Sequence, residues 1–168
     1  DLANNALTLD DGMAGLSIAQ PVTLDAAGEK LVTGGADLSL NGGISAAAGT
    51  LSSTGGTVSA SGFSAGAAGI INFQGGTLSI PNGATLASGA SFSTSNTTLN
   101  LGGSLAVADT WTITSTSVSL TTDNASLSST VPLSLASLQT NGYDFELASA
   151  TSDLTIENAF ALSGSETL

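Results

Sequence analysis

The chain has 168 residues, of which 41% are hydrophobic and only 8% charged, with a formal net charge of -12 and no His or Cys. This length suits one domain that can bury a core, and the hydrophobic content argues against general disorder. The single cation, Lys30, excludes nucleic acid as a favoured partner, and the lack of Cys excludes disulfides and thiolate metal sites. Ser and Thr supply the polar surface, which favours strands over amphipathic helices.

The chain begins at Asp1, without Met and without a basic-then-apolar leader segment. We interpret it as a processed product or as a piece of a longer chain. No apolar run approaches the roughly 20 residues of a membrane helix, so no membrane span is expected. The first eleven residues are interpreted as a lead-in to a repetitive region over 12–168.

A triplet of apolar, polar and apolar residues recurs in this region at intervals of 19 to 22 residues. The six regular copies have Ser or Asn in the middle: Leu16-Ser17-Ile18, Leu38-Ser39-Leu40, Val58-Ser59-Ala60, Leu78-Ser79-Ile80, Leu99-Asn100-Leu101 and Val118-Ser119-Leu120. Two less regular copies follow, Leu138-Gln139-Thr140 and Phe160-Ala161-Leu162. Six copies in register indicate a structural repeat.

Each triplet is followed by a turn signal of residues that tolerate a positive φ. The turns are Asn41-Gly42, Ser61-Gly62, Asn82-Gly83, Gly102-Gly103, Asp123-Asn124 and Asn141-Gly142. Two further apolar clusters complete the period: Leu24, Ile44, Phe63, Leu86, Leu105 and Phe145 in one, and Leu31, Leu51, Ile70, Phe92, Trp111, Leu133 and Leu154 in the other. Three short segments separated by turns therefore make one coil of about twenty residues.

A strand of three to five residues cannot bury its inward face alone, but stacked coils place like residues in apolar columns. The sequence therefore predicts an all-β fold, a three-faced right-handed parallel β-helix of about eight coils with a period near 20 residues, in one domain over 1–168. The right-handed sense follows from the usual strand-crossover preference. An antiparallel sandwich, the alternative, has no reason to repeat every twenty residues.

The coil pattern G-x-[LV]-S-[LI]-x-[NG]-G, as in GGTLSIPNG at Gly75–Gly83, resembles the β-helical passengers of autotransporters and filamentous-haemagglutinin-type adhesins of Gram-negative bacteria. The resemblance spans about Gly12 to Leu168. It implies a secreted or surface-displayed rod whose activity lies in loops, ends or neighbouring domains. Every coil here is close to minimal length, so loop-borne activity is not expected.

The sequence contains few residues that could support enzymatic chemistry. A β-helical polysaccharide lyase needs cations, and Lys30 stands without a second one nearby. The carboxylates Asp10-Asp11 and Asp144/Glu146 are candidates for glycoside hydrolysis, but neighbours along a strand or turn point in different directions. Trp111 belongs to an apolar cluster, which favours core packing over sugar stacking. Without His, a Ser nucleophile lacks its usual base, so we expect no enzyme activity.

No metal or cofactor is expected either. The segment GGADLSL at Gly34–Leu40 is similar to a calcium-binding nonapeptide, but its single Asp37 has no partner in adjacent coils. The Gly-rich runs lack the Lys and the helix of a phosphate-binding loop. We therefore interpret the acidic residues as scattered surface groups that interact with solvent.

A ligand-binding face remains as an alternative, either for glycans or for ice. The run Thr112, Thr114 and Thr116 is the longest Thr alternation, but neighbouring coils do not repeat it in phase. The regular outward ladder consists of Ser17, Ser39, Ser59, Ser79, Asn100 and Ser119. We expect these six side chains on one face.

We expect a non-enzymatic structural module of an extracellular or cell-surface bacterial protein, serving as an adhesin stalk or as a self-assembling matrix filament. Its partners are expected to be further copies end to end, or further coils of a longer chain, with glycans or a host surface as possible ligands. Neither terminus carries a convincing cap, and Phe160, Ala161 and Leu162 form the candidate assembly edge.

Overall fold

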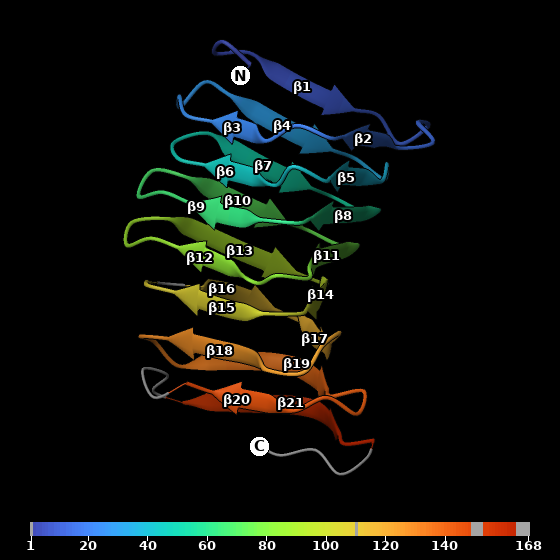
Figure 1. Cartoon of the computed structure of the whole chain (residues 1–168), viewed down its shortest axis with the longest axis vertical. Helices are drawn as coiled ribbons and strands as arrows, with labels where there is room; N and C mark the ends of the chain where they lie inside the picture. The colour runs from blue at the N-terminus through green and yellow to red at the C-terminus, as the bar shows by residue number, and fades with distance from the viewer. Residues whose placement is uncertain (1, 110, 149–152, 164–168) are drawn as a thin grey trace.

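A computed structural model describes residues 2–109, 111–148 and 153–163 of the chain. Within these residues the chain forms the strands β1 to β21 and no helix. Accordingly, the described part contains no helix long and apolar enough to cross a membrane. The strands stack into a rod with β1 at one end and β21 at the other (Figure 1).

The strands belong to three sheets, which we call A, B and C, and every pair of neighbours is parallel. Sheet A contains β1 (Ala6–Leu9), β4 (Lys30–Thr33), β7 (Thr50–Ser53), β10 (Ile70–Phe73), β13 (Ser91–Ser95) and β16 (Trp111–Thr114). Sheet B contains β2 (Leu16–Ile18), β5 (Leu38–Leu40), β8 (Thr57–Ala60), β11 (Thr77–Ile80), β14 (Thr98–Leu101), β17 (Ser117–Leu120), β19 (Leu133–Gln139) and β21 (Leu154–Ala161). Sheet C contains β3 (Val22–Leu24), β6 (Ile44–Ala46), β9 (Phe63–Ala65), β12 (Ala84–Leu86), β15 (Ser104–Val107), β18 (Ala125–Ser129) and β20 (Phe145–Leu147).

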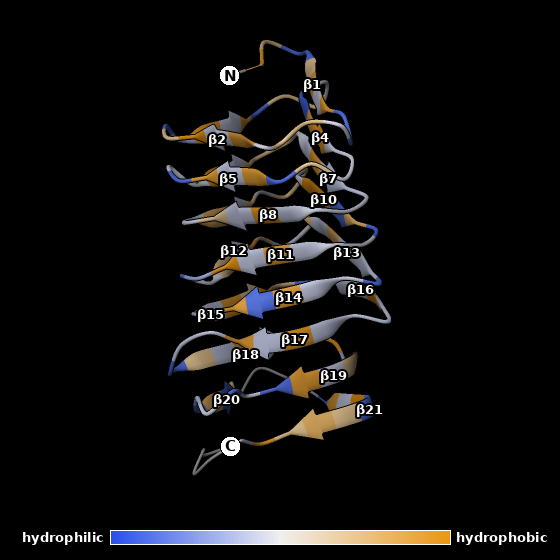
Figure 2. Ribbon diagram, turned by 90° about the vertical axis from the view of Figure 1, so that its right-hand side faces the viewer, coloured by the Kyte–Doolittle hydropathy of each residue, from blue (hydrophilic) through white to orange (hydrophobic). Residues whose placement is uncertain are grey.

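From β1 to β18 the chain visits the sheets in the order A, B, C, so each of these turns adds one strand to each sheet (Figures 1 and 2). The last three strands, β19 to β21, then alternate between sheets B and C. This arrangement confirms the predicted all-β fold with three parallel faces. The solenoid has about 7 turns with a period near 21 residues. Sheet B has eight strands, and its last two, β19 and β21, contain residues of the two irregular triplets. The first eleven residues, expected to be a lead-in, contain β1, which pairs with β4 from Ala6 opposite Lys30 to Leu9 opposite Thr33.

The triplets have the predicted orientation, with their outer residues facing into the solenoid. In sheet B, Leu78 pairs with Val58 on one side and with Leu99 on the other, and all three are fully buried. The second inward position of the same strands repeats this pattern with Leu40, Ala60, Ile80, Leu101 and Leu120. Stacked strands lie about 4.8 Å apart, so these aliphatic side chains form continuous columns in the core.

In both predicted apolar clusters, the side chains that stack in the structure differ from those expected. Ile70 was expected to face inward, but it is 42% exposed, and its neighbour Ile71 is the buried residue that pairs with Leu51 and Phe92. In sheet C, Ile44 stacks on Phe63, whereas Leu24 stacks on Ala46 two residues further along. The cluster that was expected to contain Leu24, Ile44 and Phe63 therefore divides into two parallel columns. A one-residue difference in register moves a side chain to the other face of a sheet.

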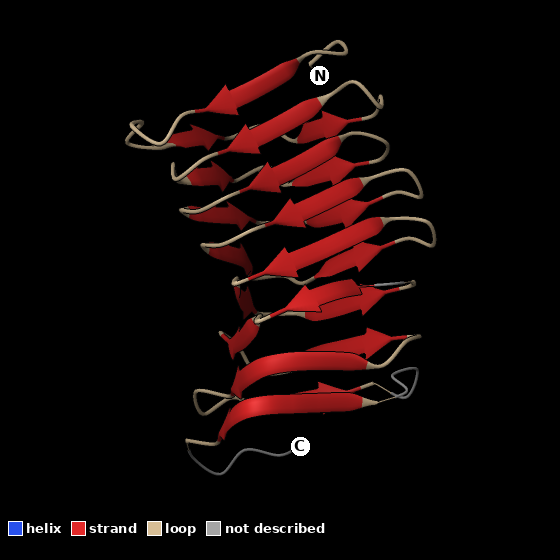
Figure 3. Ribbon diagram, turned by 180° about the vertical axis from the view of Figure 1, so that it is seen from behind, coloured by secondary structure: helices blue, strands red, loops and turns tan. Residues whose placement is uncertain are grey.

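The last two strands of sheet B are longer than the others and bend around a corner of the solenoid. The sequence placed Leu133 and Leu154 in the cluster of Leu31 and Leu51, which belong to sheet A. In the structure, Leu133 of β19 pairs with Leu154 of β21, so both lie in this bent pair of sheet B. The register shifts between Leu135 and Ser137, where the backbone N–H of Ala136 donates to the Thr116 carbonyl at 2.7 Å. Figure 3 shows the two strands as the long curved pair at the end of the stack.

Tight turns set the spacing of the coils. Gly76 has a φ of 72°, and a Cβ atom built on it would lie 2.2 Å from the Gly56 carbonyl oxygen of the preceding coil. A side chain at this position would therefore collide with backbone. The predicted turn signals also include residues with positive φ, namely Gly83 at 77°, Asn124 at 64° and Asn141 at 54°.

Candidate functional site

The outer face of sheet B carries the predicted polar ladder. Each member pairs directly with the next along the rod, in the order Ser17, Ser39, Ser59, Ser79, Asn100 and Ser119. At the two ends of the ladder, turn amides donate to its hydroxyls: Asn41 Nδ2 to Ser17 Oγ at 3.0 Å and Asn141 Nδ2 to Ser119 Oγ at 2.8 Å. The ladder is therefore one continuous column of small polar groups.

A second outward column, which the sequence analysis missed, runs beside this ladder. Its members pair in the order Thr57, Thr77, Thr98, Ser117 and Ser137. The first four lie two residues before a ladder residue, and Ser137 lies two residues before Gln139, which pairs with Ser119. The columns are therefore about 6.6 Å apart along the strands and the rungs about 4.8 Å apart. No member of either column is charged. The signal was present in the sequence as the hydroxyl residue that precedes the triplets from Val58 onward.

The Thr run on sheet A does not form a flat outward array. Thr112 and Thr114 are exposed, but Thr116 is fully buried. The Thr116 hydroxyl lies 2.9 Å from Thr94 Oγ1, which also accepts the indole N–H of Trp111 at 2.9 Å. These residues make a hydrogen-bonded polar corner inside the solenoid.

Trp111 is a core residue. Its ring is buried and stacks on Phe92 with ring centroids 4.9 Å apart and an interplanar angle of 24°. It therefore offers no platform for a sugar ring at the surface. This placement agrees with the packing interpretation made from the sequence.

Several scattered acids connect neighbouring coils, a role that the sequence analysis did not foresee. Asp37 Oδ1 accepts the backbone N–H of Thr57 at 2.7 Å, one coil further along. Asp11 accepts the N–H of Gly35 in the same way, and Asp109 accepts the N–H of Gly89. The partners are 20 to 24 residues apart in the chain. These carboxylates therefore fasten turns of adjacent coils, beyond simply solvating the surface.

Glu29 is a buried carboxylate at the N-terminal end. Its side chain is 1% exposed, and it accepts backbone N–H groups from Asp25 at 2.6 Å, from Leu2 at 3.0 Å and from Ala26 at 3.2 Å. Burial raises the pKa of Glu29, but the hydrogen bonds from Ala26, Asp25, Leu2 and Asn4 outweigh it, so the pKa lies below its ordinary value of 4.5. The first residues, expected to be too short for a cap, are thus tied to the following coil.

The candidate catalytic acids lie apart from such a buried environment. Asp144 and Glu146 are exposed near β20, where Glu146 pairs with Ser126 and the N–H of Asp144 donates to Asp123 Oδ1 at 3.3 Å. Lys30 is exposed on β4. Among the described residues, no group of three or more His, Cys, Asp or Glu side chains is placed to hold a metal ion.

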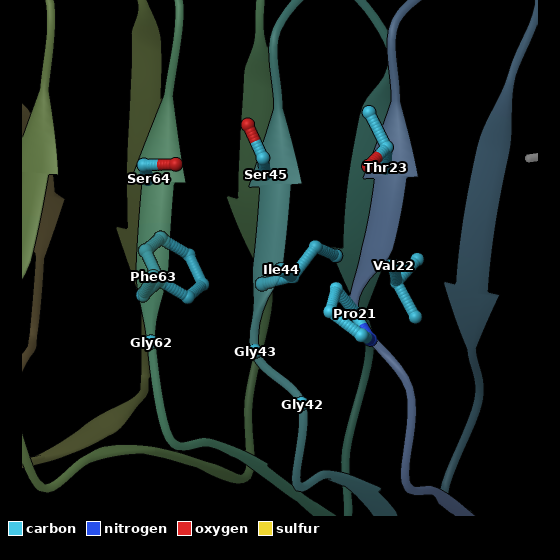
Figure 4. A pocket seen from close by; sticks show the side chains of 10 residues that line it. All are labelled: Pro21, Val22, Thr23, Gly42, Gly43, Ile44, Ser45, Gly62, Phe63 and Ser64. Atoms are coloured by element: carbon cyan, nitrogen blue, oxygen red, sulfur yellow. The ribbon is translucent and has the colours of Figure 1, made fainter.

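A shallow groove of about 280 Å³ crosses the first three strands of sheet C at the corner after sheet B. Its lining consists of Pro21, Val22, Thr23, Gly42, Gly43, Ile44, Ser45, Gly62, Phe63 and Ser64. Figure 4 shows the hydroxyls of Thr23, Ser45 and Ser64 in a row on adjacent strands. A Cβ atom on Gly42 would lie 2.3 Å from the Gln20 carbonyl carbon, so this glycine serves the packing of coils. The lining contains no charged side chain and no pair of a nucleophile and a base that could support catalysis.

No family model, curated protein or solved structure matches this chain. The structure shows the parallel β-solenoid, and no relative assigns it to the autotransporter or haemagglutinin families.

Proposed function

We propose that this chain is a non-enzymatic structural rod of a secreted or cell-surface bacterial protein, acting as a stalk like those of adhesins. The observation that carries the proposal is the continuity of its three sheets. Each inner coil is paired on both sides in register, from β4 through β14, without an inserted loop between coils. A stack of this kind is quasi-one-dimensional and sets a defined length.

The contacts between coils support a mechanical role. Backbone ladders, aliphatic columns and the carboxylates of Asp11, Asp37 and Asp109 all connect one coil with the next. Polar side chains on the outside are mostly short, and the acids supply the net charge that favours solubility. An extracellular location follows from this composition together with the resemblance to bacterial adhesin passengers.

The proposal is tested by two measurements on the same preparation. Small-angle scattering should give an elongated, rigid particle, and incubation with acidic and neutral polysaccharides should release no products. Cleavage of a polysaccharide that is lost in Asp144→Asn or Glu146→Gln would overturn the non-enzymatic role. Ser79→Ala serves as the control variant because it removes only one hydroxyl of the outward ladder.

A second candidate function is binding of a glycan or of ice on sheet B. The observation that favours it is the pair of uncharged columns, Thr57/Thr77/Thr98 beside Ser59/Ser79/Asn100, which present polar groups at regular spacings in two directions. Replacing Ser39, Ser59 and Ser79 together by Lys should abolish binding to a glycan array or thermal hysteresis. The triple replacement of Thr8, Ser52 and Ser93 by Lys, on the outer face of sheet A, is the matched control.

A further inference from the structure

The C-terminal end of the rod exposes residues that are buried elsewhere in the solenoid. β21 is the last strand of sheet B within the described residues, and it pairs only with β19. Phe160 is 44% exposed and Leu162 is 51% exposed. An open cavity of about 220 Å³ beside them is lined by Leu138, Phe145, Leu147, Leu154, Ile156 and Phe160. Figure 2 shows the apolar character of β21 along most of its length.

The N-terminal end presents a second apolar opening. A cavity of about 270 Å³ is lined by Leu2, Leu7, Ile18, Gln20, Pro21, Val22 and Leu31. Here β2 is the first strand of sheet B and β1 the first strand of sheet A. Leu16 and Ile18 of β2 are half-buried, whereas the equivalent Leu38 and Leu40 one coil further are fully buried. Apolar residues at both ends of the described rod are therefore less buried than their equivalents in inner coils.

The two ends are complementary in strand direction. Every strand pair among the described residues is parallel, so β2 and β21, which form the two opposite edges of sheet B, run in the same direction. A second copy placed end to end with the first would continue the interface that already joins each coil to the next. Neither β2 nor the Ala159–Ala161 part of β21 carries a charge or a Pro, which are the usual protections of an edge strand.

We propose that β21 of one copy binds β2 of a second copy as an additional parallel strand of sheet B. The column register of the solenoid assigns the contacts: Leu16 of the second copy lies on Phe160, Ser17 opposite Ala161, and Ile18 on Leu162. β1 of the second copy then follows the Leu154–Ile156 half of β21. The interface is heterologous and does not close, so it produces filaments.

This inference rests on the proposed structural role and extends it from a rod to a polymerising subunit. The net charge of -12 on each copy opposes stacking. Added salt screens this repulsion, since the Debye length falls from about 30 Å at 0.01 M to about 10 Å at 0.1 M. Association should therefore increase with ionic strength.

The register is tested by disulfide formation, because the chain has no Cys of its own. Chains with Ser17→Cys are mixed with chains with Ala161→Cys under mild oxidation, and directly paired positions lie within the Cα separation that a disulfide allows. We expect the mixed dimer in about tenfold excess over either homodimer. Ser59→Cys, at the same outward position in an inner coil, replaces Ser17→Cys as the control and should give no such excess.

Two further results decide the proposal. Wild-type chain should form salt-dependent filaments in electron microscopy, and Leu162→Lys should abolish them while leaving the circular dichroism of the rod unchanged. Equal yields with Ser59→Cys and Ser17→Cys, or strictly monomeric wild-type chain at high salt and high concentration, would overturn the docking. Neither of these outcomes would contradict the proposed structural role. That role would be contradicted separately, by polysaccharide cleavage.

Discussion

The triplets Leu78-Ser79-Ile80 and Phe160-Ala161-Leu162 have similar patterns, but their outer residues differ in burial. In β11 the two outer residues are fully buried, because β8 and β14 cover the strand on both sides. In the last triplet the outer residues are among the most exposed large hydrophobic side chains of the described chain. The difference shows that the pattern selects the inward face, and that a neighbouring coil on each side completes its burial.

This difference has an energetic meaning. Removing apolar surface from water contributes about 25 cal/mol per Å² of buried area. An inner coil gains this contribution on both of its edges, and a terminal coil gains it on one. Stability should therefore be highest in the middle of the rod, and the end coils should open first.

The largest expected effect comes from a charge placed in the middle of the core. Leu78→Asp buries an unpaired carboxylate between Val58 and Leu99 and should lower the free energy of unfolding by about 4 kcal/mol. Phe160→Asp, in dilute protein at low salt, should cost about 1 kcal/mol or less, because water reaches this site. Urea unfolding of both variants measures the difference, and equal losses would contradict the inequality of inner and terminal coils.

A similar contrast is expected between two turns. Gly76→Ala combines a positive φ with a collision against the Gly56 carbonyl, and should cost about 2–3 kcal/mol. Gly142→Ala near the C-terminal end has a φ of 88°, but its added Cβ meets no atom within 4 Å, so only about 1 kcal/mol of backbone strain is expected. Gly62→Ala is the control, since its Cβ would meet only Gly43 Cα at 4.0 Å. Thermal melting ranks the three variants.

The anchored N-terminal end should respond to acid. The pKa of Glu29 is lower in the folded chain than its ordinary value of 4.5. Its carboxylate therefore contributes stability above pH 4.5, and this contribution is lost as the pH falls through the lower folded pKa. The protection factors of the Leu2, Asp25 and Ala26 amides, taken relative to the intrinsic exchange rate at each pH, should fall in this acid range.

Glu29→Gln should show these lower protection factors already at neutral pH, so the protection factors of variant and wild type converge in acid. Glu146→Gln, which is exposed near the other end of the rod, is the control and should leave the N-terminal amides unchanged. Unaltered exchange in Glu29→Gln at neutral pH would contradict the anchoring role.

The smallest effect is expected on the outer face of sheet B. Ser79→Ala and Asn100→Ala should each change the free energy of unfolding by less than about 0.5 kcal/mol, because both side chains point away from the core. The same insensitivity is expected for Ala161→Ser in the terminal coil. Losses comparable to that of Leu78→Asp would mean that the inward and outward positions had been exchanged.

The inward and outward positions of the triplets could be predicted because apolar and polar residues alternate there without interruption. At Ile70-Ile71 two adjacent apolar residues fit either phase, and only the structure shows that Ile71 faces the core. The bend of β19 and β21 was missed for a related reason. Leu133 and Leu154 have the spacing of an ordinary coil, but the strands continue around a corner into sheet B.

The outer face was predicted in part. The ladder through Ser59 and Ser79 was found because its middle position repeats with the triplet. The Thr57–Thr77–Thr98 column beside it was missed, although it has the same period, because its residues lie outside the apolar–polar–apolar triplet that defines the repeat. The fastening role of Asp37 could not be seen, since its partner is a backbone N–H that carries no mark in the sequence.

Three features could be obtained from the amino-acid sequence alone: the period near twenty residues, the three strands of each regular coil and the inward side of the regular triplets. These are local properties, because alternation and turn residues act within a few positions of one another. Three others required the folded molecule: Ile71 replaces Ile70 in the core, Glu29 binds the N-terminal backbone, and Phe160 of β21 is exposed. These outcomes depend on contacts between coils, which join residues some twenty positions apart and form only when the coils are stacked.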